Sequence, residues 1–132
     1  MDGFEQLEVV KVERDEGVVT VSLSRPKALN AINEQMLHEL DHVFQTLASD
    51  SSIACVLLTG EGDRAFAAGA DIAAMSGYTD EQAQGFAQKG HRVFQQIEDF
   101  PAPVLGVING FALGGGCELA LACDVLYASE KA

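Results

Sequence analysis

The chain has 132 residues, which is enough for one domain, residues 1–132, and too few for a second core. Its 8 basic and 20 acidic side chains give a formal net charge of −12, which excludes a nucleic-acid-binding protein of the ordinary basic kind. The longest apolar run, residues 53–58, is far shorter than a membrane span, and the acidic start carries no signal segment. We therefore expect a cytoplasmic protein with no membrane or nucleic-acid partner, whose reduced thiols are Cys55, Cys117 and Cys123.

Residues 7–13 and 18–24 are predicted to form a β-hairpin, with residues 15–17 as the turn. Apolar and polar side chains alternate along the second strand, which is typical of a strand that is buried on one face. Its buried face would comprise Val19, Val21 and Leu23. Pro26 ends the pattern because proline has no N–H to donate to a neighbouring strand.

A helix is predicted after this break, with Asn30 or Asn33 as its N-cap. Its apolar residues recur at helical spacing and would form one buried face, made of Ile32, Met36, Leu37, Leu40, Val43, Phe44 and Leu47. The apolar run that follows, residues 53–58, is typical of a strand that is buried on both faces of a parallel sheet.

A second helix is predicted from Thr79, because Thr79 and Gln82 have the spacing of a capping box. Pro101 and Pro103 should follow its end. The apolar residues of this segment again recur at helical spacing, so that the inner face would comprise Ala83, Phe86, Ala87, Gly90, Val93, Phe94 and Ile97.

Residues 104–108 predict another buried strand, residues 117–123 a third helix and residues 125–128 a last strand. The resulting order, β-β-α-β-α-β-α-β, indicates an α/β fold. Twice in this order, at residues 56–72 and 104–118, a buried strand runs through a loop of Gly and Ala into a helix. Such loops present free backbone N–H groups, and their small side chains let the oxygen atom of a ligand approach closely.

One segment, His38-Glu39-Leu40-Asp41-His42, matches the H-E-x-x-H zinc motif letter for letter. Successive residues of a helix advance by about 100°, which places His38 and His42 roughly opposite the apolar face. We therefore expect a solvated helix face here and no metal site. His91 has no partner nearby in the sequence, and we interpret it as a surface residue.

Gly114, Gly115 and Gly116 precede Glu118 at the start of the third predicted helix. The run lacks the G-K-[ST] ending of a P-loop, and the third glycine of a G-x-G-x-x-G motif would fall on Leu119. Taken alone, the glycines form a tight turn from strand to helix. Glu118 either complements the helix dipole or is a carboxyl in apolar surroundings that exchanges protons with a bound molecule.

Three segments together resemble the crotonase (enoyl-CoA hydratase/isomerase) superfamily, and the match is nearest to the hydratases. They are residues 25–31 (RPKALNA), 65–72 (AFAAGADI) and 109–119 (NGFALGGGCEL), and they occur in the order of the family. The resemblance runs over essentially the whole chain. It implies a crotonase-like spiral of repeated β-β-α units, of which this chain would be the N-terminal half.

The resemblance also implies a site for an acyl-CoA thioester. The backbone N–H groups of Ala70 and Gly115 would form an oxyanion hole, and Glu118 matches one of the two glutamates with which hydratases hold and deprotonate water. The expected substrate-binding residues are Lys27, Ala28, Ala68, Ala70, Asp71, Ile72 and Gly115. Asp71 fits equally well as the cap of a short helix. Coenzyme A is part of the substrate, so no cofactor and no metal are implied.

By the same resemblance, the second glutamate and a C-terminal helical region used for trimer assembly lie beyond residue 132. We expect a parent enzyme, a trimer-based homo-oligomer, that hydrates trans-2-enoyl-CoA to 3-hydroxyacyl-CoA in fatty-acid β-oxidation, with little activity in the short chain alone. The net negative charge works against anionic CoA, so attraction would come from Arg25 and Lys27.

Several alternatives stay open. The chain is a fragment of a longer enzyme, or a separate chain completes its site, or it is a non-catalytic acyl-CoA-binding or assembly module. Within the same fold, the reaction is hydration, isomerisation of the double bond, or another enolate chemistry on a CoA thioester.

Overall fold

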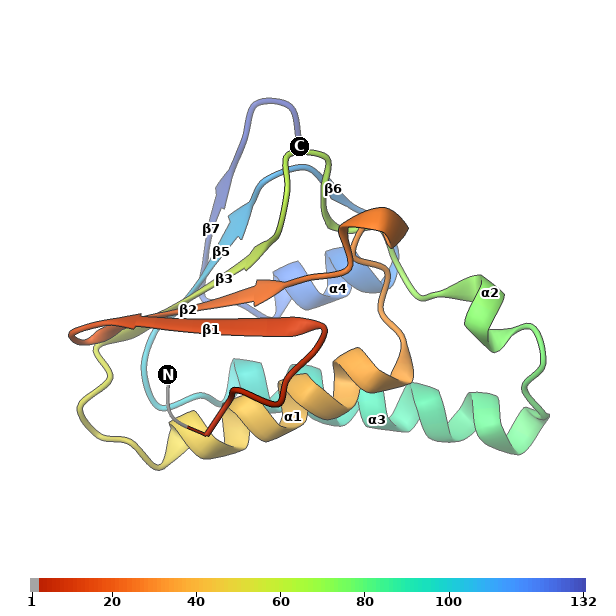
Figure 1. Ribbon diagram of the computed structural model, residues 1–132, viewed down its shortest axis with the longest axis horizontal. Coiled ribbons are helices and arrows are strands. Elements are labelled where there is room, and N and C mark those ends of the chain that lie inside the picture. Colours follow the sequence, from red (N-terminus) through yellow and green to blue (C-terminus); the bar gives the residue numbers. More distant parts are fainter. Residues whose placement is uncertain (1–2) are drawn as a thin grey trace.

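The computed structural model describes residues 3–132, which form a five-stranded sheet, a two-stranded sheet and the helices that pack on them (Figure 1). The strand order of the larger sheet is β1 (Val10–Asp15), β2 (Val18–Leu23), β3 (Cys55–Gly60), β5 (Val104–Ile108) and β7 (Val125–Ala128). The longest helices, α1 (Glu34–Ala48) and α3 (Asp80–Glu98), contact each other and lie side by side on one side of this sheet.

The predicted hairpin is confirmed, with β1 and β2 antiparallel and Val12 opposite Val21. The buried face of β2 is the predicted one, since Val19, Val21 and Leu23 are fully buried. The first strand, however, begins at Val10 and not at residue 7. The N–H of Leu7 donates to the carbonyl oxygen of Phe4 at 3.2 Å in a turn, so that this part of the chain is not available to the sheet.

Contacts with Glu39 also account for the late start of β1. The Oε1 atom of Glu39 accepts hydrogen bonds from the backbone N–H groups of Glu8, Val9 and Val10, at 3.0, 2.9 and 3.1 Å. The side chain is only 5% exposed, so the expectation of a solvated face is wrong at this position. His38 and His42 are exposed, as predicted. Glu39 therefore anchors the N-terminal segment on α1.

Replacing Glu39 by Ala is expected to lower the free energy of unfolding by about 2 kcal/mol, because three amides lose a charged acceptor and water replaces it only in part. Urea denaturation followed by circular dichroism measures this change. Glu39→Gln keeps an oxygen acceptor of the same shape and should lose less than the alanine variant. Equal stability of the wild type and Glu39→Ala would contradict the anchoring role.

The strands β2, β3, β5 and β7 run parallel to one another, as expected for an α/β fold. Burial alternates along β3, where Val56, Leu58 and Gly60 are buried while the residues between them are half-buried. The prediction of a strand buried on both faces is therefore wrong. The long helices lie on one side of the sheet, so only that side is fully covered.

Both long helices begin where the sequence predicts. Asn33 is the N-cap of α1, and its side chain accepts a hydrogen bond from the N–H of Met36. Thr79 and Gln82 form the predicted capping box of α3. The predicted apolar face of α1 is buried. On α3 only Phe86, Val93 and Ile97 are buried, because several of the other apolar residues line a cavity described below.

The structure contains two short strands that the sequence does not predict, β4 (Ala65–Ala67) and β6 (Phe111–Ala112), which pair in parallel. The single turn α2 (Ile72–Met75) is the short helix that one interpretation of Asp71 predicts. The third predicted helix, α4 (Gly115–Leu121), begins two residues earlier than expected. The chain therefore repeats a β-β-α unit, β3-β4-α3 and then β5-β6-α4, as the resemblance implies.

Within residues 3–132, no helix is both long enough and apolar enough to cross a bilayer. The same part of the chain contains no group of three or more His, Cys, Asp or Glu side chains arranged to hold a metal ion. The cysteines Cys55, Cys117 and Cys123 form no disulfide bond.

Candidate active site

Two glycine-bearing loops meet at the N-terminal end of α4. The first follows β4 and carries Ala70, and the second follows β6 and leads into Gly115, the first residue of α4. A Cβ atom placed on Gly115 would lie 3.7 Å from the backbone nitrogen of Ala70, so the two residues lie next to each other. Within residues 3–132, neither the Ala70 N–H nor the Gly115 N–H donates a hydrogen bond to another group of the protein. The structure therefore brings together two unpaired amides from separate loops.

The first loop is held by a parallel bridge between Ile32 and Ala70. The N–H of Ile32 donates to the carbonyl of Gly69 at 2.7 Å, and the N–H of Asp71 donates to the carbonyl of Ile32 at 2.8 Å. Along an extended segment, successive N–H groups point to opposite sides. Because the Asp71 N–H points toward Ile32, the Ala70 N–H points away from it.

The second loop is tied to the first by backbone hydrogen bonds. The N–H of Leu113 donates to the carbonyl of Ala67 at 3.2 Å, and that of Phe111 to the carbonyl of Arg64 at 3.0 Å. Gly114 has φ = 52°, a conformation that glycine adopts without strain, and it turns the chain into α4. Gly116 lies directly against β4, because a Cβ atom there would be 1.8 Å from the carbonyl oxygen of Ala67.

Both amides border one cavity of about 220 Å³. Glu118, in the first turn of α4, lines the same cavity and is exposed to solvent. The rest of the cavity wall comes from α1, from α3, from the segment before α1 and from α2. Apart from His91, the side chains of this part of the wall are apolar. This part consists of Ile32, Leu37, Met75, Phe86, Ala87, Gly90, His91 and Phe94. A carboxyl group and two free amides thus share a small apolar hollow.

His91 is exposed, as predicted, but the sequence does not reveal that it lines this cavity. It lies one helical turn from Ala87 and Phe94 on α3, and helical spacing from those residues is the signal that could have placed it there. His91 and Glu118 are the two ionisable side chains in the wall.

The other predicted substrate-binding residues lie outside this cavity. Lys27 is exposed and Ala28 is half-buried on the 3₁₀ turn η1 (Pro26–Ala28), beside a separate hollow of about 340 Å³. Ala68 is half-buried, and Ile72 is 79% exposed. Of the predicted site residues, the fold therefore brings Ala70, Gly115 and Glu118 together at one cavity. The other predicted residues flank this cavity.

Asp71 caps α2, which confirms one of the two interpretations of this residue. Its carboxylate accepts a hydrogen bond from the N–H of Ala74 at 3.1 Å and forms an ion pair with Arg25 at 3.0 Å. The backbone N–H of Ala74, and after it the Arg25 guanidinium, lower the pKa of the Asp71 carboxyl. Arg25 is therefore paired with Asp71 within the protein.

The ion pair predicts a pH-dependent stability. Because the pKa of Asp71 is lowered from 3.8 in the folded protein, its contribution is present above pH 4 and is lost as the pH falls through the folded-state value. Asp71→Asn keeps a capping oxygen and removes the charge. We expect this variant to be less stable than the wild type at pH 7, with a smaller difference at pH 3, measured as urea midpoints. The same difference at both pH values would contradict this assignment.

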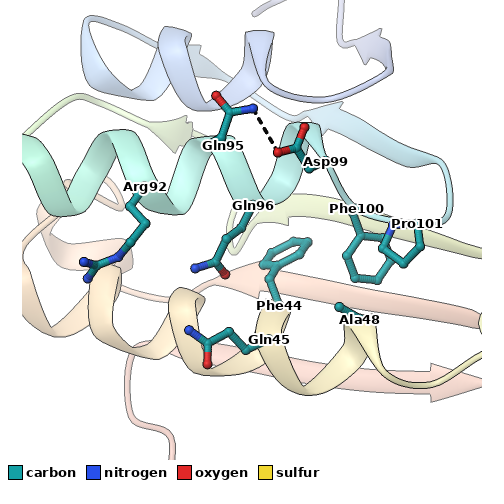
Figure 2. Close-up of a pocket in the computed structure, with 9 residues that line it drawn as sticks. All are labelled: Phe44, Gln45, Ala48, Arg92, Gln95, Gln96, Asp99, Phe100 and Pro101. Carbon is teal, nitrogen blue, oxygen red and sulfur yellow. Dashed lines mark hydrogen bonds between the residues drawn. The ribbon is translucent and has the colours of Figure 1, made fainter.

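A larger cavity, of about 410 Å³, lies elsewhere, between α1 and α3 (Figure 2). It contains none of the predicted site residues. Gln96 donates from its amide nitrogen to Asp41, and Gln45 donates to the same carboxylate oxygen at 3.1 Å. The contact between Gln96 and Asp41 joins the two helices, and we assign this region to helix packing.

The comparisons with known proteins agree with this architecture. The family model described as enoyl-CoA hydratase/isomerase matches residues 13–132. The chain is 42% identical over 127 residues to the short-chain-enoyl-CoA hydratase of Clostridium acetobutylicum, covering 96% of this chain and 49% of that protein. It is 40% identical over 125 residues to the crotonyl-CoA hydratase of Syntrophomonas wolfei, covering 95% of this chain and 48% of that protein.

The crystal structure of an enoyl-CoA hydratase from Bacillus anthracis superposes with a TM-score of 0.93 at 36% sequence identity, covering 95% of this chain and 49% of that chain. The fold is therefore the α/β fold of the crotonases. The chain belongs to the enoyl-CoA hydratase/isomerase family. It spans about half the length of the curated relatives that it matches.

Proposed function

We propose that this chain carries the thioester-binding part of an enoyl-CoA hydratase, which adds water to a trans-2-enoyl-CoA to give a 3-hydroxyacyl-CoA. The observation that supports this most directly is that Gly115 lies next to the backbone nitrogen of Ala70, with both N–H groups unpaired, beside a cavity that Glu118 also lines. The names of the relatives, short-chain-enoyl-CoA hydratase and crotonyl-CoA hydratase, support the choice of reaction.

In this proposal the thioester oxygen lies between the two amides. Glu118 takes a proton from water as the water oxygen bonds to C3 of the enoyl group. The electrons of the double bond move toward the thioester oxygen, where the N–H donors stabilise the negative charge, and a proton then adds at C2. Fixed donors suit this step because removing one of them typically costs about 3–4 kcal/mol of transition-state energy.

The rest of the cavity wall is suited to the acyl group, since it is made mainly of apolar side chains from α1 and α3. Lys27 is exposed beside the hollow next to η1, and we propose that it contacts the phosphates of CoA there. The backbone near Ala28, Ala68 and the segment 71–72 would flank the pantetheine arm. No cofactor enters this scheme, because CoA is part of the substrate.

By the family resemblance, a second glutamate beyond residue 132 shares the handling of the water, and we propose that it completes the site. The same resemblance leads us to propose a trimer-based homo-oligomer and a place in β-oxidation. A cytoplasmic location agrees with the unpaired cysteines. Isomerisation of the double bond is the second candidate reaction, since it would use the same pair of amides.

The test has a binding arm and a turnover arm. Crotonyl-CoA is titrated into ¹⁵N-labelled protein, and the amide signals of Ala70 and Gly115 are expected to shift, with the largest changes in the spectrum. Turnover is followed by the loss of the enoyl-thioester absorbance. The 132-residue chain is assayed alone and together with the unmatched half of the C. acetobutylicum hydratase, expressed as a separate fragment.

Shifts at both amides, with turnover in at least one preparation, support the hydratase. Shifts without turnover in either preparation favour the non-catalytic acyl-CoA-binding module. A movement of the double bond instead of its loss, seen by NMR of the product, favours the isomerase. An unchanged position of both amide signals would rule out the thioester site.

A further inference from the structure

We infer that Arg25 is a positioning residue, which holds the Ala70 N–H in place through Asp71, and that it does not bind CoA directly. This inference rests on the proposed function, since it concerns the amide that would bind the thioester oxygen. It assigns to the ion pair a role in the geometry of the site.

Arg25 bridges the two segments that form the Ile32–Ala70 bridge. One guanidinium nitrogen, Nη1, donates to the carbonyl of Ala31 at 2.6 Å, and the other, Nη2, donates to the carboxylate of Asp71 at 3.0 Å. These acceptors flank the bridge, since Ala31 precedes Ile32 and Asp71 follows Ala70. In Figure 1, the segment between η1 and α1 (orange) runs beside the green segment that leads into α2. A single side chain thus clamps both strands of the bridge.

The segment that carries Arg25 is itself firmly held. The backbone N–H of Arg25 donates to the side-chain oxygen of Asn30 at 2.8 Å. Asn30 is 1% exposed, and its amide nitrogen donates to the carbonyls of Glu61 and Ala65, at 3.1 and 2.9 Å. Asn30 has φ = 56°, a left-handed conformation that asparagine tolerates better than most residues. The backbone from which the Arg25 side chain extends is therefore held by hydrogen bonds to a buried residue.

Asp71 is also fixed on both of its oxygens. Oδ2 accepts from Arg25, and Oδ1 accepts from the N–H of Ala74 at 3.1 Å. The Arg25 side chain is 21% exposed and that of Asp71 is 17% exposed, so the pair is only partly accessible to water. The planar guanidinium can reach two acceptors at once from fixed directions. An ammonium group at this position, on a shorter side chain, is a point charge and would not hold both contacts in the same geometry.

The direction of the Ala70 N–H depends on this arrangement, since Ala70 lies between two residues that are bonded across the bridge. Oxyanion stabilisation depends on the donor lying at the correct distance and angle from the oxygen. We expect Arg25→Lys and Asp71→Asn to weaken the binding of a thioester by about tenfold, because both variants release the same loop.

The experiment separates positioning from direct binding of CoA. Wild type, Arg25→Lys and Asp71→Asn are titrated with crotonyl-CoA and with crotonyl-N-acetylcysteamine, which has the same thioester but no phosphates. Arg14→Lys is the matched control, since Arg14 forms a similar ion pair with Asp50 at 2.7 Å, and neither residue lines the candidate site. The readouts are the amide shift of Ala70 and the hydrogen exchange of the Ile32 and Asp71 amides without ligand.

A positioning role predicts that both site variants lose affinity for both ligands, with a smaller Ala70 shift and faster exchange at the bridge, while Arg14→Lys behaves as the wild type. If Arg25 instead contacts the phosphates, Asp71→Asn will leave Arg25 free and will bind CoA at least as well as the wild type. That result, or unchanged exchange in Arg25→Lys, would overturn the inference. No response of the wild type at either amide would refute the proposed function itself.

Discussion

Gly115→Ala is expected to fold like the wild type and to lose thioester binding by about a hundredfold or more. The new Cβ atom would lie 3.7 Å from the nitrogen of Ala70 and 3.9 Å from Cδ1 of Ile32, which are ordinary contact distances. The methyl group therefore fits the protein. It occupies, however, the space beside the Ala70 amide in which the thioester oxygen is proposed to bind.

The stability of this variant is expected to equal or slightly exceed that of the wild type, because Gly115 lies in helix α4 and alanine favours a helix by up to about 1 kcal/mol over glycine. Binding is measured by calorimetry with crotonyl-CoA, and stability by urea denaturation. Gly85→Ala, on α3 with open space around its Cβ position, is the matched control and should leave binding unchanged. Wild-type affinity in Gly115→Ala would contradict the proposed position of the oxygen.

The opposite outcome, a loss of stability, is expected for a substitution at the adjacent residue, Gly116. A Cβ atom on Gly116 would lie 1.8 Å from the carbonyl oxygen of Ala67, so Gly116→Ala must displace α4 from β4. We expect a loss of about 3 kcal/mol in the free energy of unfolding. The pair of variants therefore separates a substitution that blocks the site from one that disturbs the fold.

Glu118→Gln is expected to lower turnover by a factor of about 10² to 10⁴ while leaving thioester binding nearly unchanged. Glutamine has the same shape but cannot take a proton from water. The measurement is the rate at which the enoyl-thioester absorbance disappears, in the preparation that turns over. Glu98→Gln, an exposed position at the end of α3, is the matched control. Unchanged turnover in Glu118→Gln would show that its carboxyl group does not transfer protons in the reaction.

Local sequence signals predict much of the fold. The alternation along β2, the Asn33 cap and the Thr79–Gln82 capping box are confirmed, because each depends on residues close together in the chain. The short strands β4 and β6 are missed because two or three residues are too few to show a period. The late start of β1 is missed because it depends on Glu39, about 30 positions away.

The candidate site is predicted only in part, for the same reason. A sequence does not show which backbone amides form a binding site, and small residues such as Ala70 and Gly115 are the only local signal. It is the family resemblance that identifies these two residues. The cavity that unites them with Glu118 is closed by side chains from α1 and α3, which only the tertiary structure brings together. The pairing of Arg25 with Asp71, 46 positions apart, is likewise a product of folding.

The backbone bonds between the two glycine-bearing loops have a thermodynamic consequence. Because residues 64–67 and 111–113 are already joined by hydrogen bonds, and because Gly116 rests against β4, the spacing of the two amides is set before any ligand arrives. Little conformational entropy of these loops remains to be lost if the proposed thioester binds, so the cost of ordering them should not reduce its affinity. The receptor is preorganised, and its main chain should move little between the free and the liganded protein.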